Sequence, residues 1–201
     1  MTAPARRVVG NISLSLDGRI CGPAGEYDMG WIVPHAITDG SRSHMVRVTQ
    51  DATTALLGRK NYQGFAGFWP SVAANEDADP KDRAFSRWLN EVEKVVFSTT
   101  LTEAAWDGTG EVRVAGTDPV TTVKELRQQP GGDIVVLAST SVIRALLAAD
   151  ELDRLSITSC PELVGGGAPF FDEAVPGTSW ALVDSTPTES GALCLLYDRR
   201  R

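Results

Sequence analysis

Hydrophobic positions along this chain of 201 residues fall into short apolar runs separated by amphipathic and polar segments. Runs typical of strands occupy residues 7–16, 55–57, 94–97, 111–115, 133–138, 155–160, 180–184 and 192–197. Helical patterns occupy residues 44–55, 82–92, 118–126 and 141–149. Strands that alternate with helices and end in two neighbouring strands predict one α/β domain, with a mostly parallel sheet of about eight strands and an antiparallel C-terminal hairpin.

The first apolar run is unusual because one of its faces is polar. Successive side chains of a strand point to opposite faces of the sheet. Val9, Asn11, Ser13 and Ser15 therefore share one face. The opposite face is apolar and carries Val8, Ile12, Leu14 and Leu16. A polar face on an otherwise apolar strand predicts contact with a ligand or with water.

Composition narrows the class of protein. The formal charge of -7 and the pI near 4.9 argue against a general nucleic-acid or anionic-membrane surface. No apolar run approaches the length of a membrane span, and the N-terminus lacks the apolar core of a secretory signal. Cys21, Cys160 and Cys194 are odd in number and lack CxxC spacing, which predicts a reducing cytoplasm. With only His35 and His44 besides, a zinc site is not expected.

Polar residues directly follow three of the apolar runs, as Gly58-Arg59-Lys60, Ser98-Thr99-Thr100 and Ser139-Thr140-Ser141. Ligands of open α/β sheets bind beyond the carboxyl ends of the strands. The three segments are therefore expected to lie together at one mouth of the sheet.

Each strand end has a binding interpretation and a structural one. The Arg59 guanidinium suits a phosphate monoester such as a nucleotide 2′-phosphate; alternatively, Arg59 and Lys60 are a solvated pair at the start of a helix. Ser139 and Thr140 precede a helix whose first amides suit a phosphate, or they only cap that helix. Residues 98–100 add hydroxyl donors, or form a polar turn. Three such ends together favour a bound nucleotide.

A glycine-rich segment, LVGGGAPFF, spans Leu163 to Phe171. Its glycines let the backbone approach a ligand or let the loop move. We expect a mobile loop that a ligand orders; the alternative is a rigid turn. No GK[ST] follows and no GxGxxG occurs in the chain, so neither phosphate-binding fingerprint is present.

Five segments follow one another in a recognisable order: SLSLDG, LLGRKNY, KVVFST, DIVVLASTSVIRALL and LDRLSITSCPELVGGGAPFF. From about Val8 to Tyr197 the chain resembles the C-terminal reductase domain of the bifunctional riboflavin-biosynthesis deaminase-reductase. The resemblance implies the three-layer fold of dihydrofolate reductase. The zinc deaminase half is missing, because the chain has neither H-x-E nor P-C-x-x-C.

The resemblance also implies NADPH as cofactor and assigns residues to it. Arg59 of the GR motif, with Lys60 assisting, corresponds to the residue that meets the 2′-phosphate. The further cofactor positions are Ser13 beside the nicotinamide amide, Gly58, Ser98 and Thr99 near the adenosine ribose, Ser139, Thr140 and Ser141 at the pyrophosphate, and Gly165 and Gly166 in the glycine-rich loop. The pyrophosphate turn usually carries glycine, whereas this chain has Ala138-Ser139.

For the substrate, the resemblance places Asn11 toward the reacting group; alternatively, Asn11 is an ordinary strand residue that bonds to a neighbouring loop. Asp28 and Trp31 are the further substrate candidates. An aromatic wall of Trp31, Tyr62, Phe65 and Trp69 is a further expectation, with core packing as its alternative. Aligned on Trp31 and Pro34, the acidic residue of dihydrofolate reductase falls on Ala36. An alanine cannot assist protonation of a pterin, which makes dihydrofolate reduction the second choice.

These observations predict a cytoplasmic NADPH-dependent reductase that acts on a small heterocyclic substrate. The reaction that the resemblance implies is reduction of 5-amino-6-(5-phosphoribosylamino)uracil, with a homodimer as the assembly. A dihydrofolate or other pterin reductase is one alternative. A nucleotide-binding protein without catalysis is another, of a different class.

Overall fold

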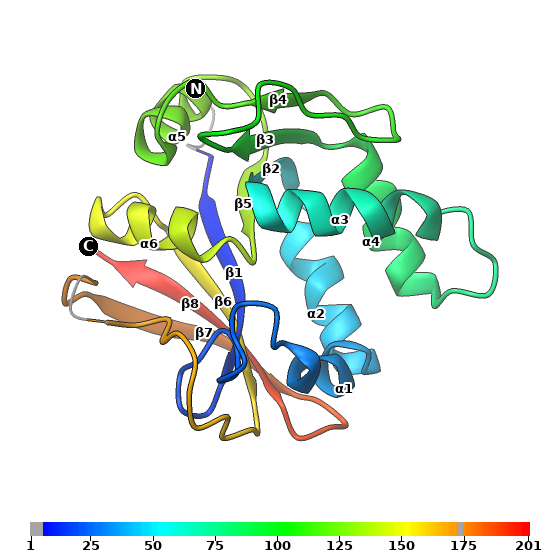
Figure 1. Cartoon of the computed structure of the whole chain (residues 1–201). Coiled ribbons are helices and arrows are strands. Elements are labelled where there is room, and N and C mark those ends of the chain that lie inside the picture. The colour runs from blue at the N-terminus through cyan, green and yellow to red at the C-terminus, as the bar shows by residue number, and fades with distance from the viewer. Residues whose placement is uncertain (1–5, 173–174) are drawn as a thin grey trace.

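The computed structural model describes residues 6–172 and 175–201. Eight strands form one mixed sheet in the order β4-β3-β2-β5-β1-β6-β8-β7 (Figure 1). The strands are β1 (Val8–Ser15), β2 (Ala52–Gly58), β3 (Glu93–Phe97), β4 (Val112–Val114), β5 (Asp133–Leu137), β6 (Arg154–Cys160), β7 (Ser179–Pro187) and β8 (Leu193–Arg200). In this order, neighbouring strands from β4 to β6 are parallel to each other. The strand β8 is antiparallel to β6, and β7 is antiparallel to β8. The predicted sheet and its C-terminal hairpin are confirmed.

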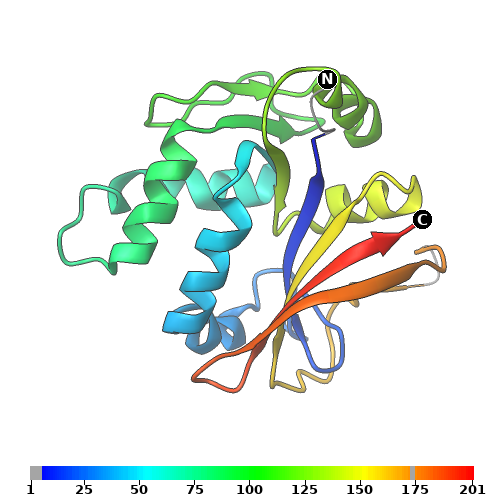
Figure 2. The same cartoon turned by 180° about the vertical axis from the view of Figure 1, so that it is seen from behind.

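Helices cover both faces of the sheet and give three layers (Figures 1 and 2). One face carries α2 (Asp39–Thr49), α3 (Arg59–Val72) and α4 (Pro80–Glu91), and the other carries α5 (Pro119–Arg127) and α6 (Thr140–Ala148). Two short elements, η1 (Gly30–Ile32) and α1 (Val33–Ala36), precede α2. This layered α/β arrangement is the one that the sequence pattern predicts.

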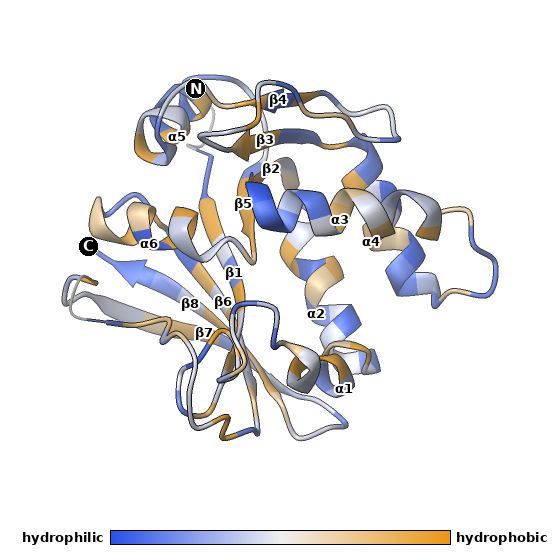
Figure 3. Ribbon diagram, viewed as in Figure 1, coloured by the Kyte–Doolittle hydropathy of each residue, from blue (hydrophilic) through white to orange (hydrophobic). Residues whose placement is uncertain are grey.

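Two apolar cores lie on opposite faces of the sheet, and β1 contributes to both. Val8, Ile12 and Leu14 belong to the core beneath α5 and α6. Val9 belongs to the core beneath α2, α3 and α4. The predicted alternation of β1 is therefore confirmed, and its polar residues face the α2 layer. Figure 3 shows the apolar central strands and the polar first turn of α3 beside them.

The helical pattern expected over residues 44–55 is wrong at both ends. The helix α2 begins at Asp39, where Thr38 accepts a hydrogen bond from the Ser41 amide at 3.3 Å, and it ends at Thr49. Residues 52–58 form β2, which pairs with β3 and β5 on its two sides. Pairing on both edges overrides local helical periodicity.

The helix α3 is absent from the expected helices because its sequence contains weak helix formers. Gly64 and Gly67 lie within it and Pro70 lies in its last turn, and each of these residues lowers helix propensity. Packing against α4 compensates. The Trp69 ring lies 4.6 Å from the Phe85 ring, edge to face. The side chain of Ser86 donates to the Trp69 carbonyl at 2.5 Å.

Neither the cysteines nor the helices provide a cross-link or a membrane span in the described residues. Cys21, Cys160 and Cys194 are free and buried. Burial raises the pKa of the Cys160 thiol to about 11, so it stays protonated and unreactive near neutral pH. No described helix has both the length and the apolar character needed to cross a bilayer.

Candidate active site

The carboxyl ends of β2 and β5 are tied together by side chains. The Gly58 amide donates to Ser139 Oγ at 2.8 Å, and Ser139 Oγ donates to the Leu137 carbonyl at 2.8 Å. From the first turn of α3, Asn61 Nδ2 donates to the Ala138 carbonyl at 2.5 Å and to Ser139 Oγ at 3.2 Å. The buried Ser139 hydroxyl is thereby fully used. The expected meeting of these two strand ends is confirmed.

The end of β3 lies at the same edge of the sheet. Phe97, its last residue, pairs in register with Gly58. Ser98 follows, and its hydroxyl accepts from the amides of Thr100 at 3.1 Å and Leu101 at 2.9 Å. These bonds make residues 98–101 a polar turn, as the structural interpretation expects. Thr99 is exposed beside this turn.

Two long helices that begin at this mouth lack side-chain caps. Among the described helices of nine or more residues, α2, α4 and α5 are capped by Thr38, Asp79 and Asp118. The helices α3 and α6 begin after Gly58 and Ser139 without such a bond. The capping interpretation of Ser139 is therefore wrong, because its hydroxyl bonds to Gly58 and Leu137 instead. The free first-turn amides of both helices, and their dipoles, point to a site for an anion.

Positive charge at the start of α3 has no explanation within the helix itself. Cations near a helix N-terminus are unfavourable by about 0.3–1 kcal/mol, yet the first turn of α3 contains Arg59 and Lys60 and no acidic residue. Lys60 forms an ion pair with Glu26. Arg59 is exposed and has no acidic partner in residues 6–172 and 175–201. An anion at this mouth would account for both the uncapped helices and Arg59.

The turn between β5 and α6 contains a strained residue. Ala138 has a φ of 46°, in the left-handed region that favours glycine. In the described chain, Asp150 is the other residue besides glycine with positive φ. Ala138, which stands where the pyrophosphate turn usually carries glycine, therefore has a backbone conformation that favours glycine.

The strand β1 has an open edge beside this turn. Its pairing with β5 ends at Asn11↔Leu137, and the Asn11 carbonyl accepts from the Ala138 amide at 2.9 Å. From Ile12 to Ser15 the described strands pair with β1 on the β6 side alone, up to Ser15↔Cys160. Asn11 stands at the inner end of the open edge, and Ser13 lies along it.

Asp28 and Trp31 lie on the segment that follows β1. Asp28 Oδ2 accepts from the Ala24 amide at 3.1 Å, and the Asp28 carbonyl accepts from Trp31 Nε1 at 3.2 Å. The Glu26–Lys60 ion pair brings this segment against the start of α3. Ala36, in contrast, is exposed at the end of α1.

The aromatic side chains of α3 are explained by packing. Tyr62 is buried, and its hydroxyl donates to the Ala105 carbonyl at 2.6 Å and accepts from the Ala105 amide at 2.7 Å. Phe65 and Trp69 pack against the core beneath α3 and α4. Of the four residues expected to form an aromatic wall, these three follow the core-packing alternative, and Trp31 bonds to the Asp28 carbonyl.

The glycine-rich loop is bound to the segment after β1. Asp17 accepts from the amides of Val164 at 3.2 Å and Gly165 at 3.1 Å. Gly165 has a φ of 69°, and a Cβ at Gly166 would lie 2.9 Å from Pro23 Cβ. These contacts place Gly165 and Gly166 against residues 17–23, which the sequence did not indicate.

A hydrogen-bonded cluster around His35, which the sequence did not indicate, lies beyond the carboxyl end of β6. His35 is buried, with Nε2 3.0 Å from Glu162 Oε1 and Nδ1 2.9 Å from Ser190 Oγ. It joins α1, the segment after β6 and the turn between β7 and β8. Its partners are more than 120 positions away in the sequence, so no local signal marks them.

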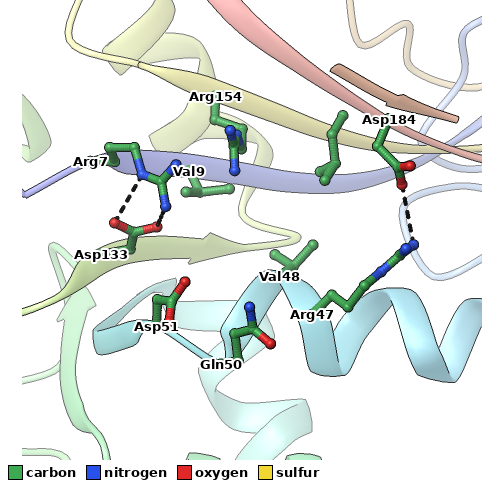
Figure 4. A pocket seen from close by; sticks show the side chains of 10 residues that line it. Arg7, Val9, Arg47, Val48, Gln50, Asp51, Asp133, Arg154 and Asp184 are labelled. Atoms are coloured by element: carbon green, nitrogen blue, oxygen red, sulfur yellow. Dashed lines mark hydrogen bonds and ion pairs between the residues drawn. The ribbon is translucent and has the colours of Figure 1, made fainter. Parts of the chain in front are cut away.

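A pocket of about 220 Å³ lies at the opposite end of β1, toward its amino terminus (Figure 4). Its arginines are engaged in internal ion pairs. The Arg7–Asp133 distance is 2.8 Å and the Arg47–Asp184 distance is 3.3 Å. Arg154 pairs with Asp198 at 2.6 Å, just outside the lining. Arg59, which has no acidic partner in the described part of the chain, and the uncapped starts of α3 and α6 lie elsewhere, at the carboxyl ends of the strands.

Comparison with solved structures defines the class of fold. The dihydrofolate reductase of Enterococcus faecalis, complexed with NADP(H), has a TM-score of 0.60 at 16% identity, covering 97% of each chain. A putative riboflavin biosynthesis protein from Shewanella sp. PV-4 has a TM-score of 0.70 at 23% identity, covering 97% of this chain and 99% of that one. The fold is that of dihydrofolate reductase.

The family follows from the sequence itself. The family model described as the RibD C-terminal domain matches residues 6–194. The chain belongs to this reductase-like family. The Bacillus subtilis (strain 168) protein YyaP, whose function is uncharacterized, is 25% identical over 192 residues, covering 96% of this chain and 94% of YyaP.

One further structure shares the fold across part of its length. It is the diaminohydroxyphosphoribosylaminopyrimidine deaminase/5-amino-6-(5-phosphoribosylamino)uracil reductase of Thermotoga maritima, with a TM-score of 0.63 at 17% identity. The match covers 98% of this chain and 57% of that protein.

Proposed function

We propose that this protein is an NADPH-dependent reductase whose substrate resembles 5-amino-6-(5-phosphoribosylamino)uracil. The observation that carries the proposal is the mouth formed by β2 and β5. Two helices begin there without side-chain caps, next to Arg59, which has no acidic partner among the described residues. Free amides, helix dipoles and a guanidinium are the groups that bind phosphates. Membership of the RibD C-terminal domain family supports NADPH as the source of those phosphates.

In this proposal, different residues of the mouth bind different groups of NADPH. Arg59 binds the 2′-phosphate, with Lys60 assisting when released from Glu26, and the pyrophosphate lies at the first turn of α6. The remaining cofactor positions are Ser13 on the open edge of β1, Gly58, Ser98, Thr99, Ser139, Thr140 and Ser141 at the strand ends, and Gly165 and Gly166 in the glycine-rich loop. Ser139 acts through its backbone, because its hydroxyl is already engaged.

The substrate lies against the open edge of β1. NADPH supplies a hydride when bound, and reduction of the ribosyl group to ribityl also requires a proton near the sugar C1. In this proposal Asn11, at the inner end of the edge, orients the reacting group. Asp28 and Trp31 are held to each other by the bond between the Asp28 carbonyl and Trp31 Nε1 and are proposed to contact the substrate from the segment that meets α3.

Binding of two cofactors to an Arg59 variant tests the proposal. Loss of a charged hydrogen bond of roughly 1.5–3 kcal/mol predicts that Arg59→Ala weakens NADPH binding by about 10- to 150-fold. NADH lacks the 2′-phosphate and should be almost unaffected. The control is Arg87→Ala, an exposed arginine on α4. Equal losses for NADPH and NADH would contradict the role of Arg59, and no NADPH binding by the wild type would contradict the function.

Dihydrofolate reduction is the second candidate, with a weaker basis in the site. The fold is shared with dihydrofolate reductase, but Ala36 is exposed and offers no carboxylate. We expect kcat/KM for dihydrofolate below about 10⁴ M⁻¹s⁻¹, the lower end of ordinary enzymes. A binding protein without catalysis is the remaining alternative, and oxidation of NADPH with a pyrimidine or pterin precursor would exclude it.

We further propose that the protein is a cytoplasmic homodimer. Its three thiols are free, which suits a reducing compartment. Large apolar side chains are exposed on the terminal hairpin at Leu182, Val183 and Leu193. Exposed apolar residues that cluster often mark an interface. A Leu182→Lys variant that remains a dimer in light scattering would argue against this surface.

A further inference from the structure

A buried chain of polar side chains crosses from α2 to β1. His44 Nε2 lies 2.7 Å from Ser156 Oγ, and Asn11 Nδ2 donates to the same oxygen at 2.9 Å. His44 is 1% exposed, Ser156 is fully buried and Asn11 is 6% exposed. Asn11 and Ser156 pair in register on β1 and β6, and His44 approaches them from the helix above. A polar chain at this depth is costly unless its members satisfy one another.

The chain ends at the open edge of β1. Asn11 is the last residue of β1 that pairs with β5, and its carbonyl binds the first amide of the β5–α6 turn. The Asn11 carboxamide therefore stands where the strands separate. Its Oδ1 has no partner among the described residues and is not sealed from solvent, whereas His44 Nδ1 is sealed without a partner.

The directions of the two bonds follow from giving every hydrogen an acceptor. The Ser156 hydroxyl has one hydrogen and two lone pairs, and it accepts from Asn11 Nδ2. Among the described residues, His44 Nε2 is the other partner of Ser156 Oγ, so the hydroxyl donates there and the ring proton of a neutral His44 resides on Nδ1. A proton on Nε2 would instead make Ser156 accept from His44. The Ser156 hydrogen would then need Asn11 Oδ1 as its acceptor, and the amide nitrogen of Asn11 would face the open edge.

We propose that His44 and Ser156 are positioning residues that hold the Asn11 carboxamide with its oxygen toward the open edge of β1, where it accepts a hydrogen bond from an N–H group of the ligand. The inference rests on the proposed function. The N–H belongs either to the carboxamide of the nicotinamide or to a ring or amino nitrogen of the heterocyclic substrate. In both cases Asn11 selects a donor and disfavours a ligand that presents an acceptor at this point.

The tautomer of His44 tests the orientation without any ligand. Nitrogen-15 NMR of the imidazole should show a proton on Nδ1 and none on Nε2 in the wild-type protein. Ser156→Ala should abolish this preference, and Ser156→Thr, which keeps the hydroxyl, should restore it. A wild-type His44 protonated on Nε2 would overturn the proposal even if NADPH binds.

Cofactor binding then identifies the donor, using NADPH and its 3-acetylpyridine analogue, in which a methyl group replaces the carboxamide nitrogen. Loss of one neutral hydrogen bond predicts roughly fivefold weaker binding of the ligand that carries the N–H. If Ser156→Ala weakens NADPH but not the analogue, the donor is the nicotinamide. If both cofactors bind as in the wild type while KM for the pyrimidine substrate rises, the donor is the substrate.

The control for both arms is Ser86→Ala, which removes an equally buried hydroxyl on α4 that donates to the Trp69 carbonyl of α3. Effects of Ser156→Ala that match those of Ser86→Ala would show general destabilisation and overturn the proposal. A wild-type protein that binds no NADPH would refute the proposed function, and the tautomer measurement would still decide the orientation of Asn11.

Discussion

The Ser139 hydroxyl accepts a hydrogen bond from the Gly58 amide at 2.8 Å, across 81 positions of sequence. This bond joins the ends of β2 and β5 and fixes the spacing between the starts of α3 and α6. Both helices lack side-chain caps, so their free amides open on the same mouth. Ser139 therefore positions the proposed phosphate site, although its hydroxyl bonds to Gly58 and Leu137 and not to the ligand.

Removal of this hydroxyl should destabilise the fold measurably. Ser139→Ala leaves the Gly58 amide without its partner in a part-buried position, and an unsatisfied buried donor costs about 1–3 kcal/mol. Urea denaturation at pH 7 measures the change. Ser141→Ala, an exposed serine one position into α6, should stay within about 0.5 kcal/mol of the wild type. Equal stability of the two variants would show that the hydrogen bond between Gly58 and Ser139 contributes nothing to the free energy of unfolding.

The strained turn next to Ser139 predicts a stabilising substitution. Ala138 has a φ of 46°, which costs an ordinary residue about 1–2 kcal/mol. Glycine removes this cost but adds about 0.5–1 kcal/mol of unfolded-state entropy. We expect Ala138→Gly to raise the unfolding free energy by up to about 1 kcal/mol.

The matched control for this turn is Ala145→Gly, within α6, which should lower the unfolding free energy by about 1 kcal/mol. Thermal or urea unfolding compares the two variants. A loss of stability in both would mean that the turn relaxes without strain.

The free energy of unfolding should decrease as the pH is lowered, because of His44. Burial, with a smaller contribution from Arg47, lowers the pKa of His44 from 6.5 to about 4, and Asp184 opposes this shift. The folded state thus keeps the imidazole neutral in a range where the unfolded chain takes up a proton. The stabilisation is complete above pH 6.5 and is lost as pH falls toward 4. The difference between the two pKa values corresponds to roughly 3 kcal/mol.

A comparison with His44→Gln isolates this contribution from that of the carboxylates. Unfolding free energies at pH 7.0 and pH 4.5 should show a larger loss in the wild type than in the variant. Parallel losses in the two proteins would mean that His44 does not titrate differently in the folded state.

Hydrogen exchange should show a glycine-rich loop that is ordered without ligand. The amides of Val164 and Gly165 donate to Asp17, and the Ala168 amide donates to Cys21 Sγ at 3.4 Å. We therefore expect slow exchange at these positions in the free protein, contrary to the mobile loop that the glycines suggest. Gly166, whose amide has no acceptor among the described residues, serves as the internal control for fast exchange. Fast exchange throughout residues 164–168 that slows with NADPH would favour the mobile loop.

The sequence by itself determined the eight strands and the approximate positions of α2, α4, α5 and α6, but not α3. Alternation along β1 predicted its polar face, and Asp118-Pro119 predicted the start of α5, where Asp118 accepts from the amides of Val120 and Thr121. The three polar segments after apolar strands predicted a common mouth, because parallel strands end at one edge of their sheet. These signals succeed because backbone periodicity and helix capping depend on neighbours only a few residues apart.

The tertiary structure decided which of these groups meet. Residues 52–55 joined β2 and not α2, since strands on both sides supply their hydrogen bonds. Ser139 binds Gly58 and does not cap α6. Ser156 Oγ meets Asn11, 145 positions away in the sequence, and His44, 112 positions away. Such partners are chosen by the order of strands and the packing of α2 over them. No local pattern indicates these partners, because residues far apart in the sequence contact each other only after the sheet has assembled.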